Sequence, residues 1–201
     1  MQKQLGPCVL DGNVIRLEPL RPEHAESLLV AGHSDDWTWL PNNLSTMDSM
    51  KDWINKTLKA QEVGQECPFT VFHKQQNRII GSTRYMDIRP AAKGVEIGGT
   101  WYSPSVWGTA VNPEAKMLLL QHAFEDWGAI RVQLKTDVNN KHSQNAILKL
   151  GAKFEGQLRN HMIRRDGSFR DTMMYSITRE EWPNVKNNLN KRLKLLLQST
   201  D

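Results

Sequence analysis

Cysteine is scarce in this sequence, and long hydrophobic runs are missing from it. Only two cysteines, Cys8 and Cys67, occur among 201 residues, far apart and without the spacing of a metal site. Neither has a neighbouring residue pattern that would make it a nucleophile, so we expect two reduced thiols in a cytoplasmic protein. No apolar stretch approaches the roughly 20 residues that span a bilayer, and residues 1–12 lack the apolar core of a signal peptide. The sequence thus predicts a cytoplasmic protein without a transmembrane segment, and its length favours one domain.

A modest excess of positive charge, +4 with a pI near 9.1, suits an anionic ligand but identifies none. Much of the excess lies near the C-terminus, where basic residues alternate with leucines: Lys186, Lys191, Arg192 and Lys194. This alternation is typical of the solvent-facing side of an amphipathic helix. Nucleic-acid binding requires basic residues interleaved with exposed aromatics or a known motif, and neither is evident. We therefore expect no nucleic-acid, membrane or metal partner, and a basic nucleic-acid binder remains a third alternative that rests on the pI alone.

Helical and strand-like patterns alternate along the whole chain, without internal repeats. Pro22 opens a helix that Gly32 ends, and Thr46 or Ser45 caps a second helix that fades near Gly64. An Asp-Gly turn at residues 166–167 closes a hairpin. The predicted strands cover residues 13–19, 69–73, 79–87, 95–102, 131–138, 153–163 and 170–177, and the predicted helices cover residues 22–32, 46–64, 113–127, 141–150 and 179–196.

Residues 95–127 are the stretch around which the rest of the chain is organised. A strand-like run leads into a loop that contains Gly108-Thr109-Ala110, and a strong helix signal follows. Asn112 is placed to cap that helix, with Pro113 at its first position and Glu114 near its positive end. Free main-chain N–H groups, a helix dipole and small residues that let a ligand approach the backbone describe a phosphate site. A glycine before a helix more often only forms a turn. The order of the surrounding residues therefore has to show whether this loop is a phosphate site or only a turn.

The surrounding residues follow a fixed order: a strand, then x-x-x-Gly-x-Ala, then a helix with Glu-Ala near its start. This order resembles the pyrophosphate-binding motif of the GNAT N-acetyltransferases. The resemblance implies acetyl-coenzyme A as co-substrate, with its pyrophosphate on the main-chain amides of five residues: Trp107, Gly108, Thr109, Ala110 and Val111. The family usually opens this motif with Gln or Arg, and Ser105 holds that place here. We therefore expect the backbone contacts to remain and one side-chain contact to be lost.

A second patch, residues 136–144 followed by residues 150–156, is similar to the N-x-x-S…LGF…EG segment of the RimJ- and RimL-like branch, whose founding members acetylate ribosomal-protein N-termini. The resemblance covers residues 13–178 and implies the GNAT fold. This is an α+β fold whose mixed, mostly antiparallel sheet splays between its fourth and fifth strands and admits the cofactor there. We accordingly divide the chain into an N-terminal extension (1–12), the acetyltransferase domain (13–178) and a C-terminal helix (179–201). The acceptor does not follow, because this branch acts on many different amines.

Acetyl transfer needs a neutral amine, a polarised thioester carbonyl and a proton for the leaving thiolate. The resemblance implies that a main-chain N–H near Trp101 or Tyr102 holds the carbonyl. It also implies Glu96, on the strand beside the splay, as a base that acts through water, although Glu96 could equally serve only as a hydrogen-bond partner. His161 is the alternative base, because an imidazole titrates in the useful range, although a lone histidine on a strand is more often structural or simply exposed.

The proton for the thiolate comes from a tyrosine in many family members, and in this register its place holds Ile147, which cannot donate. The RimL-like branch is understood to use a serine at the position that here is Ser143. A helix N-cap is an alternative role for Ser143, and the two roles are compatible. Asn140 fits as a cofactor contact or as a turn residue.

The acceptor side is only weakly marked. Trp37 and Trp39 lie in a segment without clear periodicity, and we interpret both first as core anchors, with an acceptor pocket as the alternative. Asp35 and Asp36 could attract a cationic amine, so we take Asp36 and Trp39 as candidate substrate-binding residues. The apolar face of the last helix, residues 182–196, exceeds what one small sheet edge needs, and we expect a homodimer.

The sequence therefore predicts an N-acetyltransferase that moves acetyl from acetyl-CoA to a primary amine, such as a protein N-terminus, by direct attack on the thioester. A catalytically degenerate GNAT domain that binds CoA as a sensor or partner module is the alternative. It gains weight because Ser105 and Ile147 replace the usual Gln or Arg and the usual Tyr.

Overall fold

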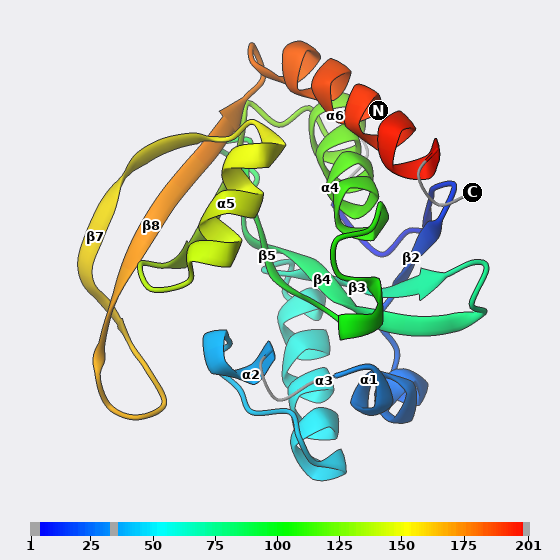
Figure 1. Ribbon diagram of the computed structural model, residues 1–201. Coiled ribbons are helices and arrows are strands. Elements are labelled where there is room, and N and C mark those ends of the chain that lie inside the picture. Colours follow the sequence, from blue (N-terminus) through cyan, green and yellow to red (C-terminus); the bar gives the residue numbers. More distant parts are fainter. Residues whose placement is uncertain (1–4, 33–35, 199–201) are drawn as a thin grey trace.

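One mixed sheet of eight strands organises the molecule (Figure 1). The computed structural model describes residues 5–32 and 36–198. Within them the strand order is β1-β2-β3-β4-β5-β6-β8-β7, and neighbours are antiparallel except β5 and β6, which are parallel. The strands are β1 (Leu10–Asp11), β2 (Ile15–Pro19), β3 (Cys67–His73), β4 (Arg78–Arg89), β5 (Gly94–Tyr102), β6 (Arg131–Asp137), β7 (Lys153–Ile163) and β8 (Phe169–Thr178). The predicted α+β class and the mixed, mostly antiparallel sheet are confirmed.

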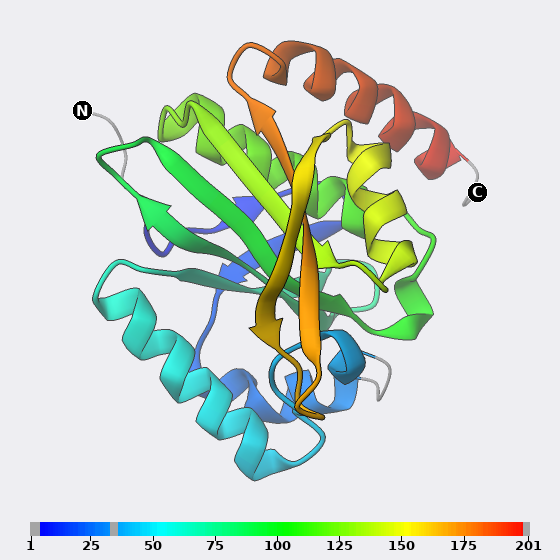
Figure 2. The same ribbon diagram turned by 90° about the vertical axis from the view of Figure 1, so that its left-hand side faces the viewer.

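Helices cover both faces of this sheet (Figures 1 and 2). They are η1 (Pro22–His24), α1 (Ala25–Ala31), α2 (Asp36–Trp39), α3 (Met47–Glu62), η2 (Pro104–Val106), α4 (Val111–Gln121), the π-helical turn η3 (His122–Asp126), α5 (Lys141–Leu150) and α6 (Trp182–Gln198). One core lies between the sheet and α1, α2 and α3, and a larger core lies between the sheet and α4, α5 and α6. No helix in the described part of the chain is long and apolar enough to cross a membrane.

The predicted boundaries agree with the structure to within a few residues where the local signals are strong. Thr46 caps α3, because its hydroxyl oxygen accepts a hydrogen bond of 3.2 Å from the main-chain N–H of Ser49. Pro22 begins the short turn that precedes α1, and Gly32 ends α1. Gly167 takes a left-handed φ of 83° in the turn between β7 and β8, as an Asp-Gly turn requires.

Helix α4 begins differently from the prediction. Ala110, not Asn112, occupies the N-cap and makes no side-chain hydrogen bond, whereas Asn112 accepts one from the Tyr102 hydroxyl. The Glu114 carboxylate does not act only on the helix dipole: it accepts three hydrogen bonds of 2.8 Å from the main-chain N–H groups of residues 13–15. This contact joins α4 to the start of β2.

Strands β5 and β6 diverge soon after they meet. Their parallel pairing joins residues 94–96 to residues 131–133 and ends there. β5 nevertheless continues to Tyr102 and β6 continues to Asp137, so the facing edges beyond Glu96 have no strand partner among the described residues. This is the splay that the family resemblance implies between the fourth and fifth strands, which are β5 and β6 when the strands are counted from β2.

The C-terminal helix packs on its own chain. Trp182, Val185, Leu189 and Leu193 of α6 are buried, and Trp182 stacks on Phe124 with ring centroids 5.4 Å apart. Figure 1 shows α6 lying along α4. The apolar face from which we expect a homodimer is therefore covered within the chain, and the oligomeric state stays a prediction without that support.

The two cysteines differ in their surroundings. Cys67 is buried in β3, and burial raises the pKa of its thiol to about 12. Cys8 Sγ lies 3.7 Å from His122 Nε2, and His122 Nδ1 lies 2.7 Å from the Asp126 carboxylate. Cys8 therefore has an imidazole neighbour that the surrounding sequence does not indicate, because His122 is 114 residues away along the chain.

Candidate active site

Strand β5 bends where it leaves β6. Gly99 has a left-handed φ of 56°, and the register with β4 shifts between Arg84 and Ser82, so that β5 accommodates one extra residue. A bulge of this kind re-aims the backbone and ends strand pairing. A Cβ on Gly99 would lie 2.6 Å from Arg84 Nε, so glycine suits this position on both grounds. Trp101 and Tyr102, near which the resemblance expects the carbonyl-binding N–H, follow this bulge.

The loop that precedes α4 presents main-chain N–H groups without acceptors. Two of the five predicted amides are engaged: Trp107 donates to the Pro104 carbonyl and Val111 to Thr109 Oγ1. In the described residues no acceptor is found for the other three, the amides of Gly108, Thr109 and Ala110, or for the amide of Asn112, the next residue of α4. A Cβ on Gly108, which has a φ of 77°, would meet nothing within 4 Å, so its backbone is open to a ligand. An uncapped helix terminus with open backbone is suited to binding a phosphate.

Ser105 is paired with an arginine from another strand. Arg78 of β4 donates from Nη2 to Ser105 Oγ at 2.9 Å, and Ser105 Oγ lies 3.0 Å from Ser103 Oγ. Arg78 and Ser105 are both exposed. A positive charge therefore lies beside the loop even though position 105 itself is neutral.

Glu96 is the last residue of β5 that pairs with β6. It is 1% exposed, and its Oε2 lies 3.0 Å from Gln133 Nε2, which donates to it, and 3.0 Å from Lys135 Nζ. Gly98 leaves room for the carboxylate, because a Cβ there would lie 3.0 Å from Glu96 Oε1. A carboxylate buried in this way persists only with such partners. Glu96 therefore places a compensated negative charge at the point where the sheet splays.

Several buried polar atoms on the strands around the splay have no hydrogen-bond partner within the described residues. They are Arg84 Nε, Trp101 Nε1, Arg170 Nε and Thr172 Oγ1. Buried donors and acceptors are normally paired. These atoms therefore fit a site that a polar ligand or water completes.

The loop of the β7–β8 hairpin is fastened to β6 and to α2. Arg164 donates to both carboxylate oxygens of Asp137, at 2.7 and 2.9 Å, and Arg165 donates to the Trp37 carbonyl. Burial alone would raise the pKa of Asp137, but hydrogen bonds from Arg164 and from the Asn139 amide outweigh it and hold that pKa below its ordinary value. The hairpin loop and α2 therefore lie together.

The two tryptophans of α2 have different roles. Trp37 is buried and meets Trp101 edge to face, with ring centroids 5.2 Å apart. Trp39 is 40% exposed, so the interpretation of both rings as core anchors is right for Trp37 and wrong for Trp39. Asp36 is the first residue of α2, and Asp35 lies outside the described residues.

Helix α5 follows β6 on the other side of the splay. Asn140 caps it, because Asn140 Oδ1 accepts a hydrogen bond of 2.9 Å from the Ser143 N–H. The N-cap role suggested as an alternative for Ser143 therefore belongs to Asn140. The Ser143 side chain is half-buried, and its hydroxyl has no partner in the part of the chain that the structure describes. Ile147, at the place of the usual tyrosine, is buried in the core.

His161 belongs to a different part of the surface. It is exposed on β7 and lines a shallow hollow together with Arg159, Asn160 and Asp171. None of the other predicted site residues lines this hollow. The structure thus brings Glu96, the bulge of β5 and the start of α4 onto one strand–loop–helix unit, and it does not bring His161 to them.

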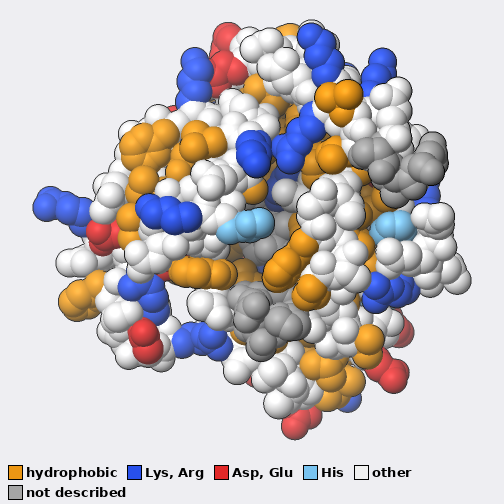
Figure 3. Space-filling model, viewed as in Figure 1, with side chains coloured by type: hydrophobic (Ala, Val, Ile, Leu, Met, Phe, Trp, Pro, Cys, Tyr) orange, Lys and Arg blue, Asp and Glu red, His pale blue; other side chains and the backbone are white. Residues whose placement is uncertain are grey.

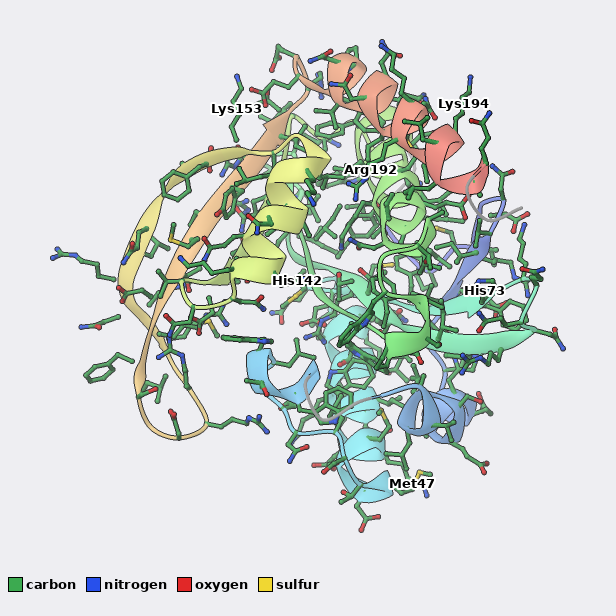
Figure 4. The ribbon with its side chains drawn as sticks, in the orientation of Figure 1. Met47, His73, His142, Lys153, Arg192 and Lys194 are labelled. Atoms are coloured by element: carbon green, nitrogen blue, oxygen red, sulfur yellow. The ribbon has the colours of Figure 1, made fainter. Side chains whose placement is uncertain are left out.

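Two residues without a predicted role in the site, His142 and Arg192, also lie at this face. Figure 3 shows a hollow near the middle of the face, with basic side chains and a histidine at its rim. Figure 4 places His142 of α5 and Arg192 of α6 beside the space between α5 and α4. Arg192 Nη1 donates to the Lys149 carbonyl at 3.4 Å, which holds this guanidinium against α5. The sequence pattern marks Arg192 only as part of a solvent-facing helix side, because the helix that it meets is distant along the chain.

Comparisons with known proteins agree with this geometry. A family model described as an acetyltransferase (GNAT) domain matches residues 15–153. The structure of a GCN5-related N-acetyltransferase from Brucella melitensis is similar with a TM-score of 0.89 and 28% identity, over 96% of this chain and 88% of that one. A protein from T. thermophilus, provisionally classed as an acetyltransferase, gives a TM-score of 0.85 and 33% identity, over 93% of this chain and 97% of that one.

Two further comparisons concern a solved structure with a bound CoA derivative and the curated proteins. Mycobacterium smegmatis RimJ, in complex with CoA-disulfide, shares the fold with a TM-score of 0.77 at 22% identity, over 93% of each chain. No curated protein matches the chain significantly. The family model spans more than half of the chain and ends beyond both β5 and β6, between which the sheet splays. This chain therefore belongs to the GNAT family of acetyltransferases.

Proposed function

We propose that the protein transfers the acetyl group of acetyl-CoA to a primary amine, by direct attack of the amine on the thioester. One observation carries the proposal: the pairing of β5 with β6 ends at Glu96, and the same strand leads directly into the uncapped start of α4. Acetyl-CoA supplies an activated acetyl group and a thiolate leaving group. The residues of the chain bind the pyrophosphate, polarise the carbonyl and move two protons.

The proposed pyrophosphate site consists of the main-chain amides of Gly108, Thr109, Ala110 and Asn112. Arg78, held on Ser105 Oγ at 2.9 Å, adds the positive charge that the family usually supplies from position 105. The predicted contacts at Trp107 and Val111 shape the loop instead, because their amides are engaged within it. The loss of a side-chain contact at position 105 is thus compensated from β4.

We propose the chemical roles of the site residues from where they lie relative to the splay. A main-chain N–H near Trp101 or Tyr102, just past the bulge, polarises the carbonyl. Ser143 delivers a proton to the thiolate, because its hydroxyl is not used as a cap. Of the two bases that the sequence suggests, the position at the splay favours Glu96 over His161, which is exposed on β7.

We place the enzyme in the RimJ- and RimL-like branch and propose a protein N-terminal amine as its acceptor. The support is the Asn140–Ser143 patch at the start of α5 and the fold shared with RimJ. The exposed Trp39 of α2, beside the hairpin loop, lies on the proposed acceptor side with Asp36. A cytoplasmic location would suit this substrate.

The experiment that tests the cofactor site is Gly108→Val, with acetyl-CoA affinity measured by calorimetry. A valine Cβ fills the open space over the backbone, and we expect affinity to fall at least about tenfold, which is about 1.4 kcal/mol. Gly64→Val is the matched control, because Gly64 has a similar φ of 73° and also nothing within 4 Å of its Cβ position. Both variants carry the same backbone strain, and only the first should lose affinity. A folded Gly108→Val protein that binds as tightly as wild type would place the cofactor elsewhere.

A CoA-binding sensor is the second candidate, favoured by the buried Ile147 at the place of the usual proton donor. Release of free thiol from acetyl-CoA, followed with a panel of peptides and small amines, separates the two functions. Turnover of any amine establishes the transferase. Tight binding of acetyl-CoA with no turnover across the panel establishes the sensor.

A further inference from the structure

Lys116 is a lysine buried between α4 and the sheet. It is 8% exposed, and its Nζ donates one hydrogen bond, of 2.7 Å, to Thr100 Oγ1. A lysine ammonium has three N–H donors, and the described residues offer no acceptor for the other two. Burying an ammonium without a counter-charge is costly. A lysine kept in such a position beside a candidate active site is therefore a candidate for a role in the chemistry.

No carboxylate among the described residues pairs with Lys116. The charged and titratable groups of the elements packed around α4 are engaged elsewhere. The ion pairs are Asp11 with Lys74, Arg16 with Glu18, Arg84 with Glu66, Glu96 with Lys135, His122 with Asp126, and Lys186 with Glu125. The other hydrogen bonds join Glu114 to residues 13–15, Tyr85 to the Leu119 carbonyl and Tyr102 to Asn112. Burial is the sole cause of the shift that lowers the pKa of Lys116 to about 7.

Thr100 is the polar group that connects Lys116 to the splay. It follows Gly99 in the bulge of β5, in the part of the strand that has left β6, and it is partly exposed. Its hydroxyl also lies 2.8 Å from Thr83 Oγ1, which is fully buried. A proton that reaches Lys116 from the splay along the hydrogen bonds of the described residues therefore passes through Thr100.

We propose that the neutral amine of Lys116, reached through the Thr100 hydroxyl, takes up the proton that the acceptor amine loses in acetyl transfer. As the N–C bond forms and the C–S bond breaks, that proton passes to Thr100 Oγ1. The Thr100 hydroxyl proton passes to the lone pair of Lys116 Nζ, which in the neutral amine accepts across the same 2.7 Å contact. The thiolate is protonated separately, and Lys116 then returns its proton to solvent. The inference rests on the proposed function and names a proton acceptor other than Glu96 or His161.

The relay has a defined pH dependence. Lys116 accepts a proton only as the neutral amine. The rate should therefore be low at pH values below the pKa of Lys116, near 7, and should rise as the pH increases through that pKa.

Lys116→Met tests the relay with little risk to the fold, because replacing a buried charge by an apolar side chain of similar volume is often neutral or stabilising. We expect kcat to fall by roughly 10²-fold or more, and the rise of kcat near neutral pH to disappear. The calorimetric Kd for acetyl-CoA should not change. A readout that needs no turnover is NMR of the ligand-free protein with ¹³C-labelled lysine: one side-chain resonance should titrate near neutral pH in wild type and be absent from Lys116→Met.

Two further variants locate the path. Thr100→Val should reproduce the rate loss, while the lysine resonance that titrates at or below neutral pH remains. The double variant Thr100→Val/Lys116→Met should be no slower than either single variant. Thr83→Val is the matched control, because Thr83 meets the same hydroxyl but not Lys116, and it should keep the wild-type pH profile.

The outcomes separate the relay from the proposed function. Turnover by wild type with an unchanged pH profile in Lys116→Met overturns the relay alone. The relay is also overturned if the rise of kcat near neutral pH disappears only in Glu96→Gln, or if the Lys116 resonance titrates like that of an exposed lysine. A wild type that releases no thiol with any amine overturns acetyl transfer itself, and the relay with it.

Discussion

Ser143 and Asn140 lie three residues apart and have different roles at the start of α5. The side chain of Asn140 accepts the Ser143 N–H at 2.9 Å and so caps α5. The hydroxyl of Ser143 has no internal partner in the described chain, which leaves it available for a proton transfer. The two roles that the sequence leaves open for Ser143 are thus distributed over two residues.

Ser143→Ala should lower kcat by roughly 10²–10⁴-fold, the usual loss for a general acid, while the melting temperature and the Kd for acetyl-CoA stay unchanged. Asn140→Ala is the comparison variant, because loss of a cap costs about 1 kcal/mol of stability and should lower the melting temperature. Steady-state kinetics and thermal unfolding of the two variants check this. A Ser143→Ala protein with normal kcat would remove Ser143 from the chemistry.

Cys8 and Cys67 should differ sharply in reactivity. Cys67 is 1% exposed, and burial raises the pKa of its thiol to about 12, so almost no thiolate forms near neutral pH. Cys8 is partly exposed and lies 3.7 Å from an imidazole that is itself held by Asp126. Iodoacetamide at pH 8 should therefore alkylate Cys8 in the native protein and Cys67 only in urea, as peptide mass spectrometry would show. Equal labelling of both thiols under native conditions would contradict the burial of Cys67.

At the scale of elements, β6, β7 and β8 are joined by a side-chain cluster as well as by the ladder. Glu155 of β7 reaches over β8 to Arg131 of β6, which donates to both carboxylate oxygens, and it accepts a hydrogen bond of 2.7 Å from Ser176 of β8. The hydrogen bonds from Arg131, and then that from Ser176, lower the pKa of Glu155 from 4.5 to about 2. The pair is over a third exposed on the glutamate side, so its contribution to stability is small.

The sign of the pH effect follows from that lowered pKa. Because the folded state holds the ionised carboxylate, the contribution of Glu155 is complete above its ordinary pKa of 4.5 and is lost as the pH falls toward about 2. Urea midpoints of wild type and Glu155→Gln should therefore differ most above pH 5 and converge at lower pH. Other carboxylates affect both proteins alike, and a difference that does not change with pH would show that the ion pair contributes nothing.

At the scale of the whole molecule, α6 completes the larger core. Its apolar face meets α4 and η3, and Trp182 also donates to the Glu125 carboxylate at 2.8 Å. A helix that seals a core within one chain stabilises the monomer, whereas the same face in a dimer interface would make stability depend on concentration.

Leu189→Ala distinguishes these cases. Leu189 is 2% exposed, so its truncation should cost about 2–5 kcal/mol. Leu195→Ala on the same helix is the matched control, because Leu195 is 68% exposed and should cost less than about 0.5 kcal/mol. Urea unfolding at two protein concentrations tenfold or more apart is the measurement. A loss for Leu189→Ala that shrinks as concentration rises would show that α6 packs on a second chain.

Short-range patterns by themselves determined most elements and the order in which they occur. The cap at Thr46, the stop at Gly32 and the Asp-Gly turn each act within a few residues, so they are legible in the sequence. Together with the motif around Gly108, that order led to the splayed sheet and to the GNAT family, which the structure and the family model confirm.

Tertiary structure alone decided which groups face one another. Glu114 meets residues about a hundred positions away, which moves it off the dipole role suggested by its place in the helix. Lys116 reaches Thr100, Cys8 reaches His122 and Arg78 reaches Ser105 across separate elements. The Lys116–Thr100 pairing, for example, joins α4 to the bulge of β5 and depends on how the helix lies against that strand. That arrangement is set by the packing of the whole core, and no local sequence signal encodes it.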